Sequence, residues 1–340
     1  MKFPASSILV IRMSGIGDVL WTTPLLANLR RAYPAAHIAY VVRTASALVL
    51  ENNPHIDEVI LFESEDLVWQ LGFLARLRKR RFDLSIDLIC SPATAIQSVV
   101  SGAQTRIGFD FRGRKYLYNH RLSARAANHG HEVEFNLFPL QYMGIPVTTR
   151  SLVWKVSARE EEQSEVTWRS IGFPREAPVV GIIPTGGYAS KKWPLEYWQE
   201  LVGLQSLQDL QFLIFWGNDT EHADAQRIAS VSSARVCVAP ASTLRQSAAL
   251  MQRCRGIVGN DSGPLHIATA LQLPVVALYG PSRPESQGPW GERAVVLQAD
   301  DVDAVCCRRV DCPDPVCMKG IAPARVAQAL LAELASAESA

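Results

Sequence analysis

An aspartate stands in a glycine-rich turn near the start of the chain, in the segment RMSGIGD that ends at Asp18. The turn follows a strand-like run and opens a helix, so its glycines and unpaired N–H groups could approach a ligand closely. It lacks the third glycine of a dinucleotide fingerprint, and a carboxylate would repel a pyrophosphate. We therefore interpret Asp18 as a base directed at an acceptor hydroxyl, with Ser14 and Gly15 beside that acceptor. The alternative is a carboxylate that only caps the helix.

A second glycine-rich turn, PTGGYASKKWP, again joins a strand to a helix. Thr185 and Gly186 could lie against a diphosphate, and the ammonium groups of Lys191 and Lys192 could neutralise the charge of a departing nucleotide. The alternative is a solvated lysine pair on a surface loop. That alternative explains one lysine better than it explains both.

A third segment, GNDSGPLH, precedes an apolar helix. Ser262 and Gly263 occupy positions where helix N–H groups could receive phosphate oxygens, while Asp261 and His266 could contact sugar or ribose hydroxyls. Glu221, in the first turn of a helix after another strand, could bind a ribose diol. Each of these residues also has an ordinary structural explanation, as a helix cap, a dipole-compensating charge or a core histidine.

Four of the seven cysteines crowd one C-terminal segment: Cys306, Cys307, Cys312 and Cys317. Thiolates this close could bind a structural zinc or iron, but the spacing lacks the paired C-x₂-C pattern of a standard site. Reduced thiols or one disulfide is the alternative that we favour. The catalytic chemistry inferred here needs no metal, and the acidic pair Asp301 and Asp303 is interpreted as part of a surface loop.

Basic residues gather at two places in the first half of the chain. The segment 67–81 reads as a helix with Leu67, Leu71 and Leu74 on one face and a cationic end. A second basic group, Arg106, Arg112, Arg114, Lys115, Arg121 and Arg125, is expected in loops. We expect Arg112, Arg114 and Lys115 to hold an anionic acceptor at a membrane surface.

Short apolar runs alternate with helix-period segments along most of the sequence, which is typical of βαβ units. The alternation blurs between residues 102 and 178, where SLVWKV resembles a strand, and restarts after it. We predict an α/β protein with two doubly wound parallel sheets: a domain over 1–160, a domain over 177–322, and a final helix within 323–340. That helix has an apolar stripe and needs a packing partner, for which the domain junction is one candidate.

The composition fits this organisation, because 340 residues with 48% hydrophobic content suffice for two cores. The net charge of +1 gives no reason to expect a nucleic-acid partner. It combines +5 over residues 1–150 with −4 over the remainder, so the halves should face different partners. Without a membrane-spanning run or a cleavage pattern, we expect a cytoplasmic protein, with contact at the inner face of the membrane.

The motifs together resemble family 9 glycosyltransferases, the heptosyltransferases of lipopolysaccharide core assembly. The matching pieces are SGIGDVLWTTPLL, KKWP, WGNDTE and NDSGPLHIATAL, and they occur in the family's order over most of the chain. The resemblance implies a GT-B fold, with an N-terminal acceptor domain, a C-terminal donor domain and an active site in the cleft between them. It also implies transfer of heptose, with inversion, from a nucleotide sugar such as ADP-heptose to an anionic glycolipid or oligosaccharide.

The same resemblance assigns roles to single residues. Asp18 matches the family's base, Lys191 its phosphate-binding lysine and Glu221 its ribose ligand, whereas Lys192 occupies a variable position. The donor-phosphate and sugar segment corresponds to Asp261, Ser262, Gly263 and His266. Thr185-Gly186-Gly187 departs from the turn that many members have. A sugar-nucleotide epimerase of similar fold, a non-catalytic sugar-nucleotide binding protein and an NAD-dependent oxidoreductase remain as alternatives.

Overall fold

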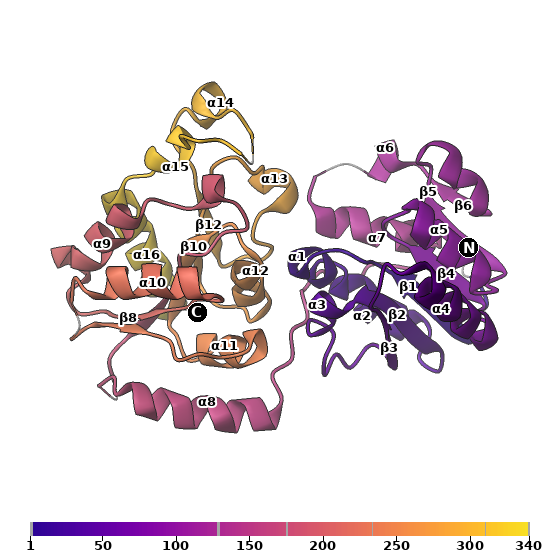
Figure 1. Cartoon of the computed structure of the whole chain (residues 1–340), viewed down its shortest axis with the longest axis horizontal. Coiled ribbons are helices and arrows are strands. Elements are labelled where there is room, and N and C mark those ends of the chain that lie inside the picture. Colours follow the sequence, from indigo (N-terminus) through magenta and orange to yellow (C-terminus); the bar gives the residue numbers. More distant parts are fainter. Residues whose placement is uncertain (1–2, 128–129, 175, 233, 310, 339–340) are drawn as a thin grey trace. The chain divides into compact units, whose positions relative to one another are not determined.

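The computed structural model describes the chain except for residues 1–2, 128–129, 175, 233, 310 and 339–340. The chain divides into two compact units, Met1–Lys155 and Val156–Ala340, called here the first and the second unit. Each unit is built around one six-stranded sheet (Figure 1). The two α/β units that the alternating pattern predicts are therefore confirmed.

The sheet of the first unit is parallel throughout and has the strand order β3-β2-β1-β4-β5-β6. Its strands are β1 (Ser7–Ile11), β2 (His37–Arg43), β3 (Glu58–Phe62), β4 (Leu84–Asp87), β5 (Thr105–Phe109) and β6 (His120–Leu122). The direction in which the chain adds strands reverses between β1 and β4. Ligands of such sheets bind beyond the carboxyl ends of the strands at this reversal.

Helices connect these strands: α1 (Ile16–Leu20), α2 (Thr23–Ala32), α3 (Thr44–Ala47), α4 (Leu67–Arg80), α5 (Pro92–Val100), the 3₁₀ helix η1 (Arg112–Leu117), α6 (Ala124–Ala127) and α7 (Glu132–Tyr142). The helical segment after β1 is split in two, α1 and α2. Pro24 lies in the first turn of α2, where its missing N–H costs nothing, so a new helix begins there. The helix after β2, α3, is a single short turn.

The α4 helix turns a different face to the core from the one that its leucines suggest. Phe73 and Leu77 are buried in the core, whereas Leu67 and Leu71 are exposed and only Leu74, of the three predicted leucines, packs against that core. The ring of Phe73 stacks on Trp69 with centroids 5.3 Å apart, and these aromatic rings fix the buried stripe. The cationic end predicted for this helix is present.

The second basic group is not confined to loops, contrary to the prediction. Arg112, Arg114 and Lys115 form part of η1, and the others lie in β5, β6 and α6. This segment is regular because Tyr118, just after η1, is buried and donates its hydroxyl to Asp87 at 2.7 Å. That hydrogen bond holds η1 close to the carboxyl end of β4.

The sheet of the second unit is also parallel, with the order β12-β11-β10-β7-β8-β9 and a reversal between β10 and β7. Its strands are β7 (Val179–Ile183), β8 (Gln211–Ile214), β9 (Val236–Val238), β10 (Gly256–Asn260), β11 (Val275–Leu278) and β12 (Ala294–Leu297). The strand predicted at SLVWKV belongs to neither sheet. The N–H of Val153 in that run donates instead to the hydroxyl of Thr23, at 2.9 Å.

The second unit contains α8 (Ala158–Ile171), η2 (Ala189–Lys191), α9 (Leu195–Gly203), η3 (Gln205–Leu207), α10 (Asp219–Ala229), α11 (Leu244–Met251), α12 (Gly263–Ala270), α13 (Pro284–Gln287), α14 (Val302–Val305), α15 (Val316–Lys319) and α16 (Pro323–Glu338). One core includes side chains of α9, α10 and α16, and another includes those of α8, α11 and α12. The final helix packs within its own unit, through Val326, Ala327 and Leu330.

Candidate active site

Asp18 lies at the carboxyl end of β1, in the third position of α1. Its Oδ2 accepts the N–H of Gly15 at 3.2 Å, so the capping role is real. Its side chain nevertheless remains 32% exposed. A carboxylate offers about four lone-pair positions. Asp18 can therefore cap the helix and still accept a proton from a bound hydroxyl.

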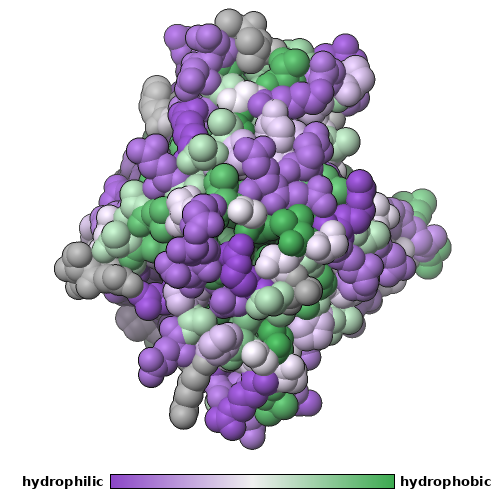
Figure 2. Space-filling view, turned by 90° about the vertical axis from the view of Figure 1, so that its left-hand side faces the viewer, coloured by the Kyte–Doolittle hydropathy of each residue, from purple (hydrophilic) through white to green (hydrophobic). Residues whose placement is uncertain are grey.

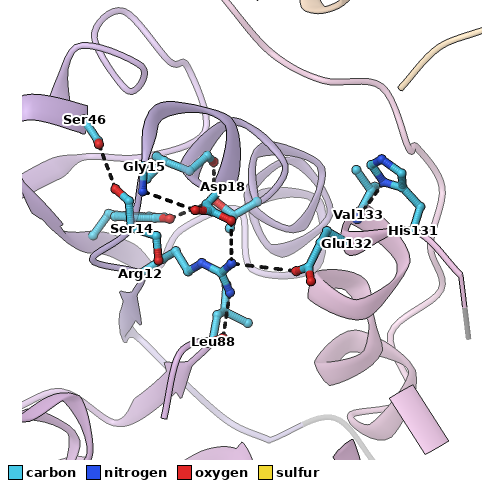
Figure 3. A network of polar contacts seen from close by, with 12 residues as sticks. Arg12, Ser14, Gly15, Asp18, Ser46, Leu88, His131, Glu132 and Val133 are labelled. Atoms are coloured by element: carbon cyan, nitrogen blue, oxygen red, sulfur yellow. Dashed lines mark hydrogen bonds and ion pairs between the residues drawn. The ribbon is translucent and has the colours of Figure 1, made fainter. Parts of the chain in front are cut away.

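Arg12, which the sequence did not single out, organises this end of the sheet (Figure 3). Its guanidinium donates to Oδ1 of Asp18 at 3.0 Å and to the carbonyl of Leu88, just beyond β4, at 2.9 Å. It also lies 3.7 Å from the carboxylate of Glu132, in the first turn of α7. Burial raises the pKa of Glu132, and the charge of Asp18 raises it further, while Arg12 lowers it. One buried cation is thus shared by two carboxylates.

The other predicted acceptor residues follow the carboxyl ends of strands in the same unit. Ser14 is fixed through its carbonyl, which accepts the hydroxyl of Ser46 at 2.8 Å, and Gly15 is exposed (Figure 3). Arg112, Arg114 and Lys115 follow β5, two strands away from β1 in the sheet. Parallel strands end at one edge, so both groups lie at the same edge of the first unit.

In the second unit, Lys191 and Asp261 form an ion pair, with Nζ 2.6 Å from Oδ2. The carboxylate is 8% exposed and the lysine side chain 20%. Oδ2 also accepts the hydroxyl of Ser282 at 2.5 Å, and His266 lies 3.7 Å from Oδ1. Burial alone would raise the pKa of Asp261, but the hydrogen bonds from His266, Lys191 and Ser282 and the charge of Lys191 lower it well below its usual value. The sequence predicted Asp261 against sugar hydroxyls, whereas its carboxylate here holds Lys191.

Asn260, the last residue of β10, fixes the lysine-containing turn and was not predicted. Its side-chain amide donates to the carbonyl of Pro184 at 2.8 Å and accepts the N–H of Trp193 at 3.2 Å. The Trp193 indole in turn donates to the carbonyl of Ile321 at 2.9 Å. Both ends of the turn are therefore attached to rigid parts of the unit, which keeps Lys191 in place.

Gly186 and Lys192 belong to the same turn. A Cβ atom at Gly186 would lie 3.2 Å from Cγ of Lys192 and 3.5 Å from Cβ of Lys191. The glycine lets the turn fold tightly under both lysine side chains. Lys192 is half-buried and forms no ion pair with any residue that the structure describes.

The α12 helix begins beside this ion pair. Ser262 is its N-cap and Gly263 its first residue, as the sequence predicts. The Ser262 side chain makes no capping bond, and its buried Oγ lacks a hydrogen-bond partner among the described residues. The N-terminal N–H groups and this hydroxyl can therefore serve an anion placed next to Lys191.

A cavity of about 230 Å³ opens beside β7, β8 and α11. Thr185 and Glu221 give it polar groups, and Trp216 and Met251 are among the apolar side chains that line it. Glu221 is fixed because its Oε2 accepts the N–H of Gly217 at 2.9 Å. Such a cavity, apolar with few polar groups, suits a flat ring carrying hydroxyls.

The C-terminal cysteines are all free thiols. They lie as two pairs, Cys306 beside Cys317 and Cys307 beside Cys312. Within the described ranges, from which residue 310 is missing, no group of three or more His, Cys, Asp or Glu is arranged to hold a metal ion. Zinc or iron at these cysteines stays a hypothesis, and not the one that the sequence favours. Of the other cysteines, Cys90 and Cys254 are buried, while Cys237 is half-buried.

Known proteins resemble this chain over most of its length. Lipopolysaccharide heptosyltransferase 2 of Escherichia coli K12 is 26% identical over 304 residues, covering 86% of this chain and 87% of that protein. Lipopolysaccharide heptosyltransferase 1 of Pseudomonas aeruginosa is 25% identical and covers 98% of this chain and 99% of its own length. No helix among the described residues is long and apolar enough to cross a bilayer.

Solved structures of other proteins have the same fold as this chain. A family 9 glycosyltransferase from Veillonella parvula superimposes with a TM-score of 0.87 at 23% identity, covering 99% of both chains. The Escherichia coli ADP-heptose lipopolysaccharide heptosyltransferase II has a TM-score of 0.77 at 25% identity, covering 98% of this chain and 99% of its own. The predicted GT-B class is confirmed. The family model for glycosyltransferase family 9 (heptosyltransferase) matches residues 71–316, and the chain is therefore a glycosyltransferase that belongs to this family.

Proposed function

We propose that this glycosyltransferase moves heptose from ADP-heptose to an anionic acceptor of the lipopolysaccharide-core type, with inversion at the anomeric carbon. The relatives are named as lipopolysaccharide heptosyltransferases, and a related Escherichia coli structure contains ADP-2-deoxy-2-fluoro heptose. The observation that carries the proposal is the Lys191–Asp261 pair beside the free N-terminus of α12. This arrangement offers a fixed cation and N–H donors to one diphosphate.

The reaction is a single displacement. The acceptor oxygen bonds to the anomeric carbon as its proton passes to Asp18. The bond from that carbon to the phosphate oxygen breaks, and ADP departs with the electron pair. Lys191 and the N–H groups at Ser262 and Gly263 stabilise the charge that develops on the diphosphate, an effect worth several kcal/mol when such groups are already in position. Attack opposite the leaving group inverts the anomeric centre.

The cavity beside β8 and α11 would take the nucleoside. An adenine ring fits between apolar side chains such as Trp216 and Met251, and the ribose hydroxyls would then reach Glu221. The pyrophosphate would extend past Thr185 and Pro264, which also line the cavity, toward α12. The diphosphate would then end at Lys191.

For the acceptor we propose contacts with Arg112, Arg114 and Lys115. None of the three forms an ion pair within the described residues, and the buried Nε of Arg114 lacks a hydrogen-bond partner there. Unpaired cations favour phosphate groups on the acceptor. We propose further that this acceptor is lipid-linked and that the reaction takes place in the cytoplasm, at the inner face of the membrane.

The donor is tested by thermal shift against a panel of nucleotide sugars, because a ligand at 100 times its Kd stabilises the folded state by about 2.7 kcal/mol. ADP-heptose should give the largest shift. NMR of the product with a core-type acceptor should show the inverted anomer. If the protein isomerises a sugar nucleotide in the absence of acceptor, it is an epimerase and this proposal is wrong.

The acceptor is tested by neutralising Arg112, Arg114 and Lys115 together. The acceptor KM should rise, by less at high salt, while donor kinetics stay unchanged. Equal transfer to an uncharged acceptor by the wild-type protein would overturn the proposed contacts.

A further inference from the structure

The two thiol pairs of the C-terminal segment differ in their access to solvent. In the inner pair, Cys317 is 3% exposed and donates a hydrogen bond to Cys306, and burial raises the pKa of Cys317 to about 12. In the outer pair, Cys307 is exposed and accepts a hydrogen bond from the thiol of Cys312. Figure 2 shows mainly hydrophilic side chains at the level where Figure 1 draws α14 and α15, the helices before and after the outer pair. A small oxidant in water can therefore reach Cys307 more readily than Cys317.

The outer pair consists of one thiol suited to attack and one suited to resolve. The N–H of Arg309 and the thiol of Cys312 both donate to the Cys307 sulfur, and with the charge of Arg309 they lower the pKa of Cys307. The pKa of Cys312 is raised, chiefly because its thiol donates to Cys307. Since the thiolate is the form that reacts with peroxides, Cys307 reacts first, and Cys312 lies next to it as a second thiol.

One residue joins the outer pair to the lysine-containing turn. Arg308, directly after Cys307, donates from its guanidinium to the carbonyl of Ser282 at 3.1 Å. The hydroxyl of the same serine donates to Asp261 at 2.5 Å, and Asp261 holds Lys191. Ser282 is thus fixed by Arg308 at its carbonyl and by Asp261 at its hydroxyl.

The conformation of Arg308 depends on the cysteines around it. Its φ is 55°, in the left-handed region that such a side chain rarely adopts. The sulfur of Cys306 accepts the N–H of Arg308 at 3.4 Å. The inner pair itself is fixed against the loop that follows β11, because a Cβ at Gly280 would lie 3.0 Å from the sulfur of Cys317. A change in the backbone at Cys307 therefore acts directly on Arg308.

We propose that Cys307 and Cys312 are a modification site for hydrogen peroxide, and that their oxidation weakens donor binding. The Cys307 thiolate attacks one peroxide oxygen, and the O–O bond breaks to give a sulfenic acid and hydroxide. The Cys312 sulfur then attacks the sulfenic sulfur to form the disulfide, and the sulfenic hydroxyl leaves as water with the proton of Cys312. Two electrons pass from the two thiols to the peroxide.

The disulfide reaches the donor site through Arg308. It draws two hydrogen-bonded sulfurs in to about 2.05 Å, which moves the backbone beside Arg308 and withdraws the guanidinium from Ser282. Asp261 and Lys191 then lose one support, and the loss of a single hydrogen bond corresponds to about fivefold in affinity. This inference rests on the proposed function, because it takes Lys191 to hold the donor diphosphate. A dithiol reductant reverses the modification.

Calorimetry with ADP, on the full chain before and after treatment with hydrogen peroxide, tests the proposal without turnover. Oxidation should raise the Kd for ADP about fivefold, and dithiothreitol should restore it. Peptide mapping by mass spectrometry should find a disulfide between Cys307 and Cys312. Cys312→Ser should bind ADP like the reduced wild type and keep that Kd after peroxide. Cys237→Ser, which removes a half-buried thiol outside the segment, is the matched control and should respond like the wild type.

Arg308→Gln tests the link itself. Without the guanidinium the reduced variant should already bind ADP about fivefold more weakly, and oxidation should add little, because both changes remove the same contact. Arg309→Gln is the matched control, since that guanidinium pairs with Asp311 and not with Ser282. In the reduced state it should bind ADP like the wild type.

Several outcomes would overturn the proposal. They are unchanged ADP binding by the disulfide form, a disulfide between Cys306 and Cys317 instead, and an equal loss of affinity in oxidised Cys312→Ser. A stoichiometric metal held by these thiols in the reduced protein would also overturn it. A reduced protein that binds neither ADP nor ADP-heptose would contradict the proposed function, and this inference with it.

Discussion

The two units carry the same kind of ion pair with opposite burial. In the first unit the cation is the more buried member, since Arg12 is 10% exposed and Asp18 32%. In the second unit the carboxylate is the more buried, since Asp261 is 8% exposed and Lys191 20%. Both pairs lie beyond the carboxyl end of a central strand, at the reversal of strand order. The first unit thus presents an acceptor of protons, and the second presents a positive charge.

Under the proposed mechanism, this difference lets one architecture supply two chemical functions. A buried partner orients the exposed group, and the ion pair offsets part of the cost of removing its charge from water. The Asp18 carboxylate is held by Arg12 but remains open to a hydroxyl, and Lys191 is held by Asp261 but remains open to a phosphate. If the comparison is right, changing an exposed member should affect catalysis or donor binding, and changing a buried member should also affect stability.

The largest effect is expected for Asp18→Asn. The amide keeps the size and part of the capping bond to Gly15 but cannot take a proton, so kcat should fall by about 10²–10⁴-fold. Donor Kd by calorimetry and the Tm should change little. Near-normal turnover would mean that Asp18 only caps α1.

Lys191→Ala should come next, because it removes the charge offered to the diphosphate. We expect a loss of about 10²-fold in kcat/KM, with weaker donor binding. Lys192→Ala, in the same turn but without the anchor of Asp261, is the matched control and should cost less than about tenfold. The reverse order would show that the wrong lysine has been assigned to the phosphate.

Asp261→Asn tests the buried member of the second pair. Without its charge Lys191 loses its anchor, so donor Kd should rise by about tenfold and stability should fall by about 2–3 kcal/mol at neutral pH. The folded-state pKa of Asp261 lies below its unfolded value of 3.8, so this stability is present above that value and is lost as pH falls below it. Urea unfolding at pH 7 and at pH 3 should show the variant's deficit shrinking at the lower pH. An equal deficit at both values would contradict the ion pair.

Glu132→Gln should have the smallest effect. It tests whether Glu132 competes with Asp18 for Arg12. Burial and the charge of Asp18 raise the pKa of Glu132, so the wild-type carboxylate loses its charge at a higher pH than an ordinary glutamate. A neutral glutamine no longer competes for Arg12, so the acid limb of the kcat/KM profile should move to lower pH by less than about one unit. Glu134→Gln, two residues along and paired with Arg150, is the control. An unchanged profile would limit Glu132 to a structural role.

Much of the fold was predictable because each strand is a short apolar run with a turn signal after it. Prediction failed where long-range contacts decide the outcome. The run containing Val153 has the composition of a strand, but its N–H groups meet side chains such as Thr23. In α4, the leucine pattern identified an apolar face correctly but could not show that Phe73 and Leu77 would take the core.

At the candidate site, too, local motifs were predictable and long-range contacts were not. Asp18, Lys191 and the start of α12 were found because each stands in a local turn motif. Glu132 and Asn260 were missed because their importance comes from partners distant in sequence, Arg12 for the first and the ends of the lysine turn for the second. A polar residue that ends a buried strand, as Asn260 does, is the one signal that could have been used.

The hydrogen bond from the Trp193 indole to Ile321 joins residues separated by 128 positions. During synthesis the ribosome makes Trp193 long before Ile321. The lysine turn therefore gains this hydrogen bond only after most of the second unit has been translated. The first unit has its own sheet and core and can fold while the second unit is still being translated. Donor binding is therefore one of the last properties that a nascent chain acquires, which delays capture of the nucleotide sugar until the protein is nearly complete.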